Sequence, residues 1–202
     1  NMFRNIPSGV GSESKLRLTD EQTNAVLEKG AAWATDNGYG NKEDLTHCES
    51  EGYIPEADAS KVSSKAKARG REQLGTLGAG NHFLEVQYVD EIYDEGIASK
   101  FGILKKGQVM VMIHCGSRGL GHQVCSDYLR AMEEAYPDVV RKLPEKDLIY
   151  APFKSQLGQD YFKAMCASAN YAWANRHIIG HYVRESFKPL FPNAEMKTVY
   201  DV

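Results

Sequence analysis

The stretch QLGTLGAGNHFLEVQ, Gln73 to Gln87, decides the fold of this chain. Its glycines allow positive φ angles and let a ligand approach the backbone closely. After Asn81 and His82, apolar and polar residues alternate from Leu84 and Glu85 onward, so every second side chain lies on the same face. The pattern predicts a glycine loop that leads into a β-strand and places Asn81 and His82 at the mouth of that strand.

A second stretch repeats this logic in another order. The nearly all-apolar run QVMVMIH, Gln108 to His114, predicts a strand with a histidine at its end. A glycine-rich turn with Arg118 follows, and residues 122–136 have the spacing of an amphipathic helix that ends before Pro137. The amides of that turn and Arg118 can hold a phosphate at the helix N-terminus. Two histidines at strand ends, His82 and His114, can converge on one metal ion.

Taken singly, a histidine at a strand end is usually structural, and glycine turns usually only connect elements. Together, GTLGAGNHFLE and IHCGSRGLGHQV closely resemble the paired signatures of the RtcB family. Its members are GTP- and manganese-dependent RNA ligases that join 3′-phosphate or 2′,3′-cyclic-phosphate ends to 5′-hydroxyl ends. The resemblance runs from MFRNIPSGVGS to the final VYDV, and one residue departs from it: Cys115 stands where the family usually has Ser.

The resemblance implies the following roles. Manganese would be held by His82 and His114, and Arg118 is the candidate for a phosphate of RNA or GTP. The phosphates of GTP would lie on a loop formed by Asn81, His82, Phe83, Leu84 and Glu85. The family's guanylylated histidine, its DxNCG motif and a further histidine ligand fall outside this segment, so no catalytic residue is expected within it. The expected partners are RNA (tRNA exon halves or broken RNA), GTP and an archease-like activator.

Residues 1–202 are therefore expected to form the central part of an RtcB-like catalytic domain and to be inactive alone. The expected fold class is α+β, with sheet strands that end in metal and nucleotide loops and with flanking helices. A capping box of Thr19 and Gln22 predicts a helix that ends near Gly38. Ser155 opens a helical stretch that runs, with a break, to about Pro189. The segment MKTVYDV predicts a closing strand, and an apolar stripe on the long helix predicts core positions at Tyr161, Met165, Ala169, Ala172 and Trp173.

A basic segment precedes the glycine loop. Residues 58–70 predict a short helix that carries Lys61, Lys65, Lys67 and Arg69, with little compensating acid. Such a charge run is usually a solvated helix face. Because the whole chain has a net charge of −3, any contact with RNA must come from a local patch, and Lys65, Lys67 and Arg69 are the candidates. The two interpretations stay open.

The remaining histidines and cysteines favour ordinary roles. His177 and His181 share a helix face but lack the glutamate of a metalloprotease motif, so we expect them to pack or face solvent. His122 is expected to cap a helix or face solvent, and His47 with Cys48 to belong to a loop. The four cysteines form no CxxC pair, which favours free thiols in a reducing cytosol and gives no sign of zinc. No apolar run is long enough for a membrane span, so a cytoplasmic protein is expected.

Three other functions remain open. A metal-dependent phosphatase or cyclic phosphodiesterase would use the same histidines without a guanylylated intermediate, so independence of GTP would identify it. A non-catalytic phosphate-binding module would tolerate the loss of both histidines. A purely structural domain would show no dependence of its melting temperature on manganese.

Overall fold

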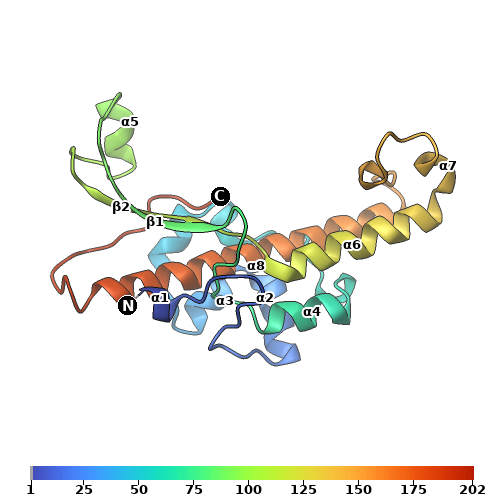
Figure 1. The fold of residues 1–202 in the computed structure, drawn as a ribbon, viewed down its shortest axis with the longest axis horizontal. Coiled ribbons are helices and arrows are strands. Elements are labelled where there is room, and N and C mark those ends of the chain that lie inside the picture. The colour runs from blue at the N-terminus through green and yellow to red at the C-terminus, as the bar shows by residue number, and fades with distance from the viewer. Residues whose placement is uncertain (1) are drawn as a thin grey trace.

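One long helix organises the computed structural model, which describes residues 2–202 (Figure 1). This helix, α8 (Gln156–Phe187), has 32 residues, and the hydroxyl of Ser155 caps it by accepting a hydrogen bond from the amide of Gly158 at 3.1 Å. Its buried positions lie all around the axis, as in a helix at the centre of a protein. The predicted break is absent, because no proline falls within the helix and neighbouring elements cover most of its length.

The other elements are shorter and surround α8. The remaining α-helices are α1 (Met2–Asn5), α2 (Asp20–Lys29), α3 (Ala31–Asp36), α4 (Ser64–Arg71), α5 (Glu95–Lys100), α6 (Arg118–Ala135) and α7 (Pro137–Val140). The 3-10 helices are η1 (Lys42–His47), η2 (Glu49–Gly52), η3 (Ala59–Lys61) and η4 (Lys146–Leu148). The strands are β1 (Phe83–Tyr88) and β2 (Val109–His114), which confirms an α+β chain.

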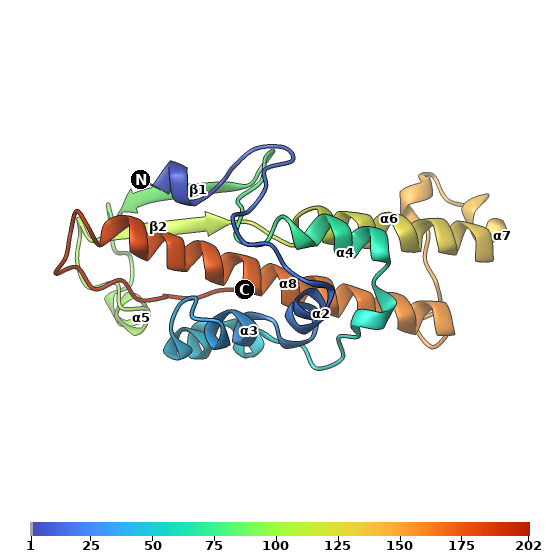
Figure 2. The ribbon, with the colours of Figure 1, turned by 90° about the horizontal axis from the view of Figure 1, so that it is seen from below.

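The main core lies where α2, α3, α4 and α6 pack on α8. Helix α6 runs antiparallel beside the first half of α8, and α2 and α3 lie across its middle (Figure 1, Figure 2). The largest fully buried side chains include Leu27, Leu74, Leu120, Tyr171 and Ile178, which come from three other segments and from α8 itself. The loop before β1 and the start of α6 are thus both anchored to the same helix.

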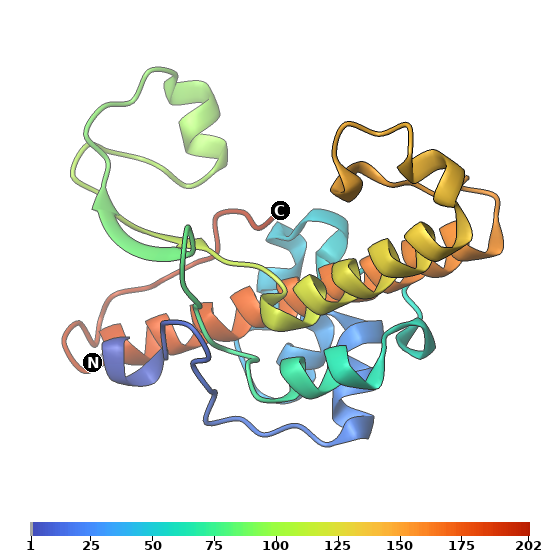
Figure 3. The same ribbon diagram turned by 45° about the vertical axis from the view of Figure 1, so that its right-hand side comes forward.

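The two strands form an antiparallel hairpin whose register runs from Phe83 opposite His114 to Tyr88 opposite Val109. The inner end of one face packs on α1 and α8, through a cluster that includes Leu84 and Ile113. The outer end and α5 project from the body, and Tyr88 there is 68% exposed (Figure 3). The predicted strand positions are confirmed. The apolar face of the hairpin, however, is covered only at its inner end, near Leu84 and Ile113.

The predicted helix from Thr19 to near Gly38 is instead two helices, α2 and α3, that meet at Gly30. The capping box of Thr19 and Gln22 is present as predicted. Gly30 has a φ of +56°, and a Cβ atom there would lie 2.1 Å from the carbonyl oxygen of Gly52. The chain bends because a segment distant in sequence packs directly on this glycine, which no local pattern reveals.

Two other predicted helices begin at different residues. The segment predicted as a helix from residue 58 begins with the 3-10 turn η3, and α4 starts only at Ser64, where the Ser63 hydroxyl caps it. Helix α6 starts at Arg118, four residues before the predicted start at residue 122, and ends at Ala135, one residue before the predicted end. The early start matters for function, because it places Arg118 in the first turn.

The predicted core stripe on α8 is partly wrong. Met165 is 47% exposed, whereas its neighbours Ala164 and Ala167 are fully buried. Trp173 is buried as predicted. The error arises because α8 is enclosed by several elements, so its buried surface is wider than the single stripe that periodicity predicts.

The closing segment, residues 196–202, forms no strand. Its only sheet contact is one isolated parallel bridge between Cys48 and Asp201. Cys48, predicted to lie in a loop, is buried beside it, and burial raises the pKa of its thiol to about 12. The Asp201 carboxylate accepts a hydrogen bond from Arg176 on α8 at 2.6 Å, so a side chain supplements the single bridge that replaces the predicted strand.

A second contact ties this segment to η1. The carboxylate of Asp44 accepts two hydrogen bonds from Arg184, both at 2.7 Å, and one from the hydroxyl of Thr198 at 2.8 Å. Asp44 is only 5% exposed.

Among the described helices, none is long and apolar enough to cross a bilayer.

Candidate metal and phosphate site

The hairpin brings His82 and His114 together, as the sequence predicted. His82 directly precedes β1 and His114 ends β2, and antiparallel pairing places both at the same end of the sheet. Their ring centroids lie 6.2 Å apart. Phe83 stacks on His114 with centroids 5.1 Å apart and an angle of 18° between the rings, which restricts the orientation of the His114 ring.

The ring of His82 lies against the backbone of the glycine loop. Its Nδ1 atom is buried and has no hydrogen-bond partner among the described residues. A Cβ atom on Gly78, whose φ is +95°, would approach this nitrogen to 2.7 Å, so only glycine fits there. Burial, and then the positive charge of Arg118 and the proximity of His114, lower the pKa of His82. His82 is therefore held neutral near pH 7, the state that a metal ligand requires.

The manganese ion that the resemblance implies fits these two imidazoles as part of a larger shell. A buried, unpaired ring nitrogen beside a second histidine is a suitable donor arrangement. Within residues 2–202, however, no group of three or more histidine, cysteine, aspartate or glutamate side chains surrounds a common point. Manganese favours oxygen-rich shells, so this pair alone would hold it weakly.

Arg118 lies next to His82 and is already partly engaged. Its Nε donates to the hydroxyl of Thr76 at 2.9 Å, and a terminal nitrogen donates to the hydroxyl of Ser12 at 3.2 Å. A Cβ on Gly78 would lie 1.9 Å from another nitrogen of the guanidinium. Arg118 has a φ of +56°, an unusual value for a residue with a side chain. The contacts with Thr76 and Ser12 fix this guanidinium beside His82 before any anion binds.

The turn before α6 offers fewer free amides than the sequence suggested. The amide of Gly119 donates to the side-chain oxygen of Gln73 at 2.9 Å. Ser117, at the helix N-cap, makes no side-chain capping bond. A phosphate at this end of α6 would therefore rely on Arg118 more than on the turn.

The predicted nucleotide loop is divided between two faces of the hairpin. Phe83 and Glu85 share the face of His114, and Asn81 is exposed in the turn before the strand. Leu84 points to the opposite face and packs in the cluster against α8. Its side chain is therefore not available to a ligand on the histidine side, where only its backbone remains close.

The basic segment reaches the same region. Lys65 and Arg69 are exposed and lie four residues apart on α4, whereas Lys67 is half-buried. A Cβ on Gly119 would lie 3.5 Å from the Cβ of Arg69, so α4 meets the start of α6 here. Among described residues, Lys61 pairs with Asp160 at 3.0 Å and Arg71 pairs with Asp20, whereas the other three cations form no ion pair.

The other helical histidines do not belong to the site. His177 is buried, and its Nε2 lies 3.1 Å from the carbonyl oxygen of Tyr39. The Nδ1 of His181 accepts a hydrogen bond from the amide of Gly40 at 3.2 Å. The predicted packing role of this pair is confirmed, and His122 is exposed to solvent as predicted.

All four cysteines are free thiols, as predicted. The thiol of Cys115 donates to the carbonyl oxygen of Leu77 at 2.9 Å, across the two loops of the site. Burial raises the pKa of this thiol, so it stays protonated and can donate. A serine hydroxyl has the same donor capacity. The departure at Cys115 therefore preserves the contact between the loops.

Sequence reasoning missed the residues that support the site. Thr76, Asn175 and Ser12 hold Arg118 or the two loops, and none was singled out. For Asn175 a signal existed, because an asparagine in the middle of an Ala-rich helix is a weak helix former and needs another reason to be there.

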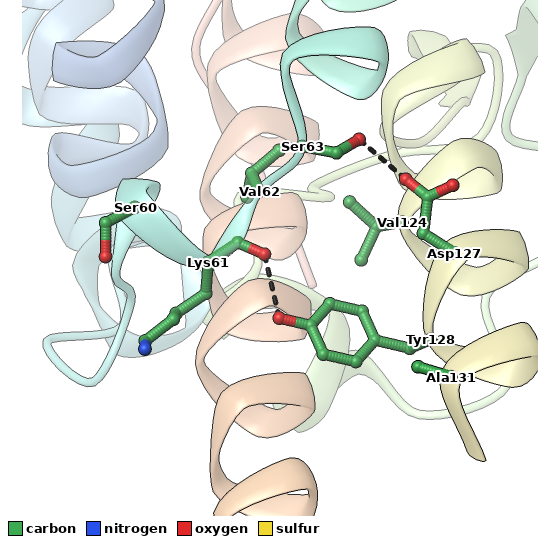
Figure 4. A pocket seen from close by; sticks show the side chains of 8 residues that line it. All are labelled: Ser60, Lys61, Val62, Ser63, Val124, Asp127, Tyr128 and Ala131. Carbon is green, nitrogen blue, oxygen red and sulfur yellow. Dashed lines mark hydrogen bonds between the residues drawn. The ribbon is translucent and has the colours of Figure 1, made fainter. Parts of the chain in front are cut away.

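A groove outside the histidine site lies among the described residues. It has a volume of about 290 Å³ and separates η3 and the start of α4 from the middle of α6 (Figure 4). Its polar groups bind one another: Ser63 donates to Asp127 at 2.6 Å, and the Tyr128 hydroxyl donates to the carbonyl oxygen of Lys61 at 2.8 Å. None of its lining residues belongs to the histidine site.

The fold and this cluster define an α+β protein with a candidate metal and phosphate site at one end of a hairpin. The family described as tRNA-splicing ligase RtcB matches residues 1–202. The chain belongs to the RtcB family.

Relatives named tRNA-splicing ligase RtcB align with the whole chain. Those of Archaeoglobus fulgidus and Thermococcus kodakarensis are each 55% identical over 205 residues, which is 100% of this chain and 42% of each relative. The relative of Methanocaldococcus jannaschii is 55% identical over 205 residues, or 21% of its length. The chain thus spans about two-fifths or one-fifth of the relatives that it matches.

Proposed function

We propose that this chain supplies part of the active site of a GTP- and manganese-dependent RNA ligase that acts in tRNA splicing or RNA repair. The reaction would join a 3′-phosphate or 2′,3′-cyclic-phosphate end to a 5′-hydroxyl end through a guanylylated histidine elsewhere in the polypeptide. One observation carries the proposal: His82, His114 and Arg118 meet at one end of the hairpin. The family membership supports the same function.

Each residue then has a specific task. The imidazoles of His82 and His114 would hold manganese, whose charge offsets the charge that builds up on phosphate oxygens. The planar guanidinium of Arg118 would bind and orient a phosphate of RNA or GTP. Phe83 keeps His114 oriented, and the loop of Asn81 to Glu85 would face the phosphates of GTP.

We also propose that residues 1–202 form the central part of the catalytic domain. The remaining ligands and the guanylylated histidine would come from other parts of the polypeptide, since the described residues offer only two converging ligands. An archease-like activator is a proposed partner of the complete protein.

Labelled GTP and RNA test this function directly. With manganese, we expect the full-length protein to form a covalent GMP adduct and to join the RNA ends, whereas residues 1–202 alone do neither. Gel analysis of labelled protein and RNA measures both reactions. An adduct on the isolated chain would mean that one of its own six histidines is the acceptor and would refute the proposed mechanism.

The same assay separates the ligase from the alternative, a metal-dependent phosphatase or cyclic phosphodiesterase. A phosphatase would release phosphate or open the cyclic end without GTP. Manganese-dependent turnover that ignores GTP would favour that alternative.

The basic segment gives a second prediction. If Lys65, Lys67 and Arg69 bind RNA phosphates, replacing all three by Gln lowers the slope of log affinity against log salt by about 0.7 to 0.9 per lost contact. The loss should be the same for every RNA sequence, because phosphates carry no sequence information. Filter binding at several salt concentrations measures the slope.

A matched control lies at the opposite end of the molecule. Lys142, Lys146 and Lys154 are exposed in the segment around α7, distant from the hairpin (Figure 1). Replacing these three by Gln changes the net charge equally but should leave the salt slope unchanged. Equal slopes for both triple variants would return the basic segment to an ordinary solvated face.

A further inference from the structure

One buried side chain on α8 joins the two loops that carry the candidate site. The Oδ1 of Asn175 accepts hydrogen bonds from the amides of Gly75 at 2.6 Å and Thr76 at 3.2 Å. Its Nδ2 faces the carbonyl oxygens of Thr76 at 3.2 Å and Gly116 at 3.1 Å, and the sulfur of Cys115 at 3.2 Å. Asn175 is fully buried. Among residues 2–202, no other side-chain amide uses its oxygen and its nitrogen to bind both of these loops.

The chemistry of the partners fixes the orientation of this amide. Two N–H donors face the oxygen and two carbonyl acceptors face the nitrogen, so a flipped amide would lose every one of these contacts. The first loop leads to His82, and the second joins His114 to Arg118. Strand pairing brings the two histidines together, and Asn175 in addition ties together the loops that adjoin them.

We propose that Asn175 is a positioning residue of the site, which sets the relative placement of His82, His114 and Arg118 by holding the two loops at a fixed separation. This inference rests on the proposed function, because the purpose of the placement is to hold manganese and phosphate. Residues that orient metal ligands typically change metal affinity by about 10- to 100-fold when they are replaced.

Asn170 provides a matched control on the same helix. It is also fully buried, and its Oδ1 accepts from the amide of Ile54 while its Nδ2 donates to the carbonyl oxygens of Leu27 and Ile54. These partners lie outside the site. Replacing Asn170 or Asn175 by Leu removes a comparable set of buried hydrogen bonds, and both changes should lower stability.

The test measures manganese binding in the full-length protein by the electron paramagnetic resonance signal of free Mn²⁺. We expect Asn175→Leu to weaken binding by about tenfold or more, and Asn170→Leu to leave it unchanged. Equal binding in the two variants would overturn the inference. If either Leu variant fails to fold, Asn175→Asp and Asn170→Asp replace the pair, since a carboxyl group keeps the acceptor and cannot supply the two N–H donors of the amide.

Two further measurements separate this inference from the proposed function. If His82→Ala leaves manganese binding unchanged, the proposed metal site fails. The ring resonances of His82 and His114 in NMR spectra then decide the positioning role alone. These resonances should shift in the Asn175 variant and stay unchanged in the Asn170 variant. Unchanged resonances in both variants would refute the positioning role of Asn175.

Discussion

We expect manganese to raise the free energy of unfolding of the full-length protein by roughly 2.7 kcal/mol at a hundredfold excess over its dissociation constant. The change His114→Ala should remove most of this gain, because it deletes one of the two imidazoles that converge 6.2 Å apart. His82→Ala should do the same. Denaturant unfolding with and without manganese measures the effect in each variant.

His122→Ala is the control for these changes. His122 is exposed on α6 and lies outside the pair, so its loss should leave the manganese effect intact. If His82→Ala and His114→Ala both keep the full stabilisation, the two residues are not ligands.

The second large effect concerns the buried ion pair of Arg184 and Asp44. We expect Arg184→Met to lower the free energy of unfolding by about 3 kcal/mol, because the Asp44 carboxylate would stay buried without its cation. Chemical denaturation near pH 7 measures the loss. The control is Arg141→Met, since Arg141 and its partner Asp138 are both exposed and such pairs add little. A loss no larger than that of the control would show that the buried pair is dispensable.

The pH dependence of that loss follows from the pKa of Asp44. Burial raises this pKa, but the hydrogen bonds from Arg184, the Asn41 amide and Thr198 outweigh burial and hold it below its ordinary value. Its contribution to stability is therefore present above the pKa of the unfolded chain and is lost as the pH falls through the folded pKa. In Arg184→Met, the hydrogen bonds from the Asn41 amide and Thr198 remain, but the bonds and the positive charge of Arg184 are lost, so the pKa of Asp44 rises. The loss in free energy of unfolding of Arg184→Met, relative to the unchanged protein, should therefore become smaller as the pH falls.

The local elements of the site could be predicted from the sequence. Alternation after His82 and the apolar run before His114 predicted both strands, and the structure places both there. The two histidines at strand ends were expected to converge, and antiparallel pairing brings them together. The resemblance to the RtcB family rested on the same residues and is confirmed. Short-range patterns sufficed because strands, glycine loops and helix caps depend on neighbours in the chain.

Contacts between distant segments could not be predicted in this way. The bend at Gly30 follows from the backbone of Gly52, and the exposure of Met165 follows from the way neighbouring elements enclose α8. The closing segment is held mainly by side chains such as Arg176 and Arg184, and not by a strand ladder. In each case the deciding partner lies far away in sequence, so periodicity contains no information about it.

The sequence by itself determined which residues can do chemistry here: two imidazoles, one guanidinium and a loop that only glycine can form. The tertiary structure alone decided how they are held. It places Thr76 and Ser12 on Arg118. It also uses Asn175 to join two loops, one 99 residues and the other 59 residues away from it in sequence. The physical reason is that buried amides and carbonyls must find hydrogen-bond partners, and packing around α8 determines which side chain is within reach.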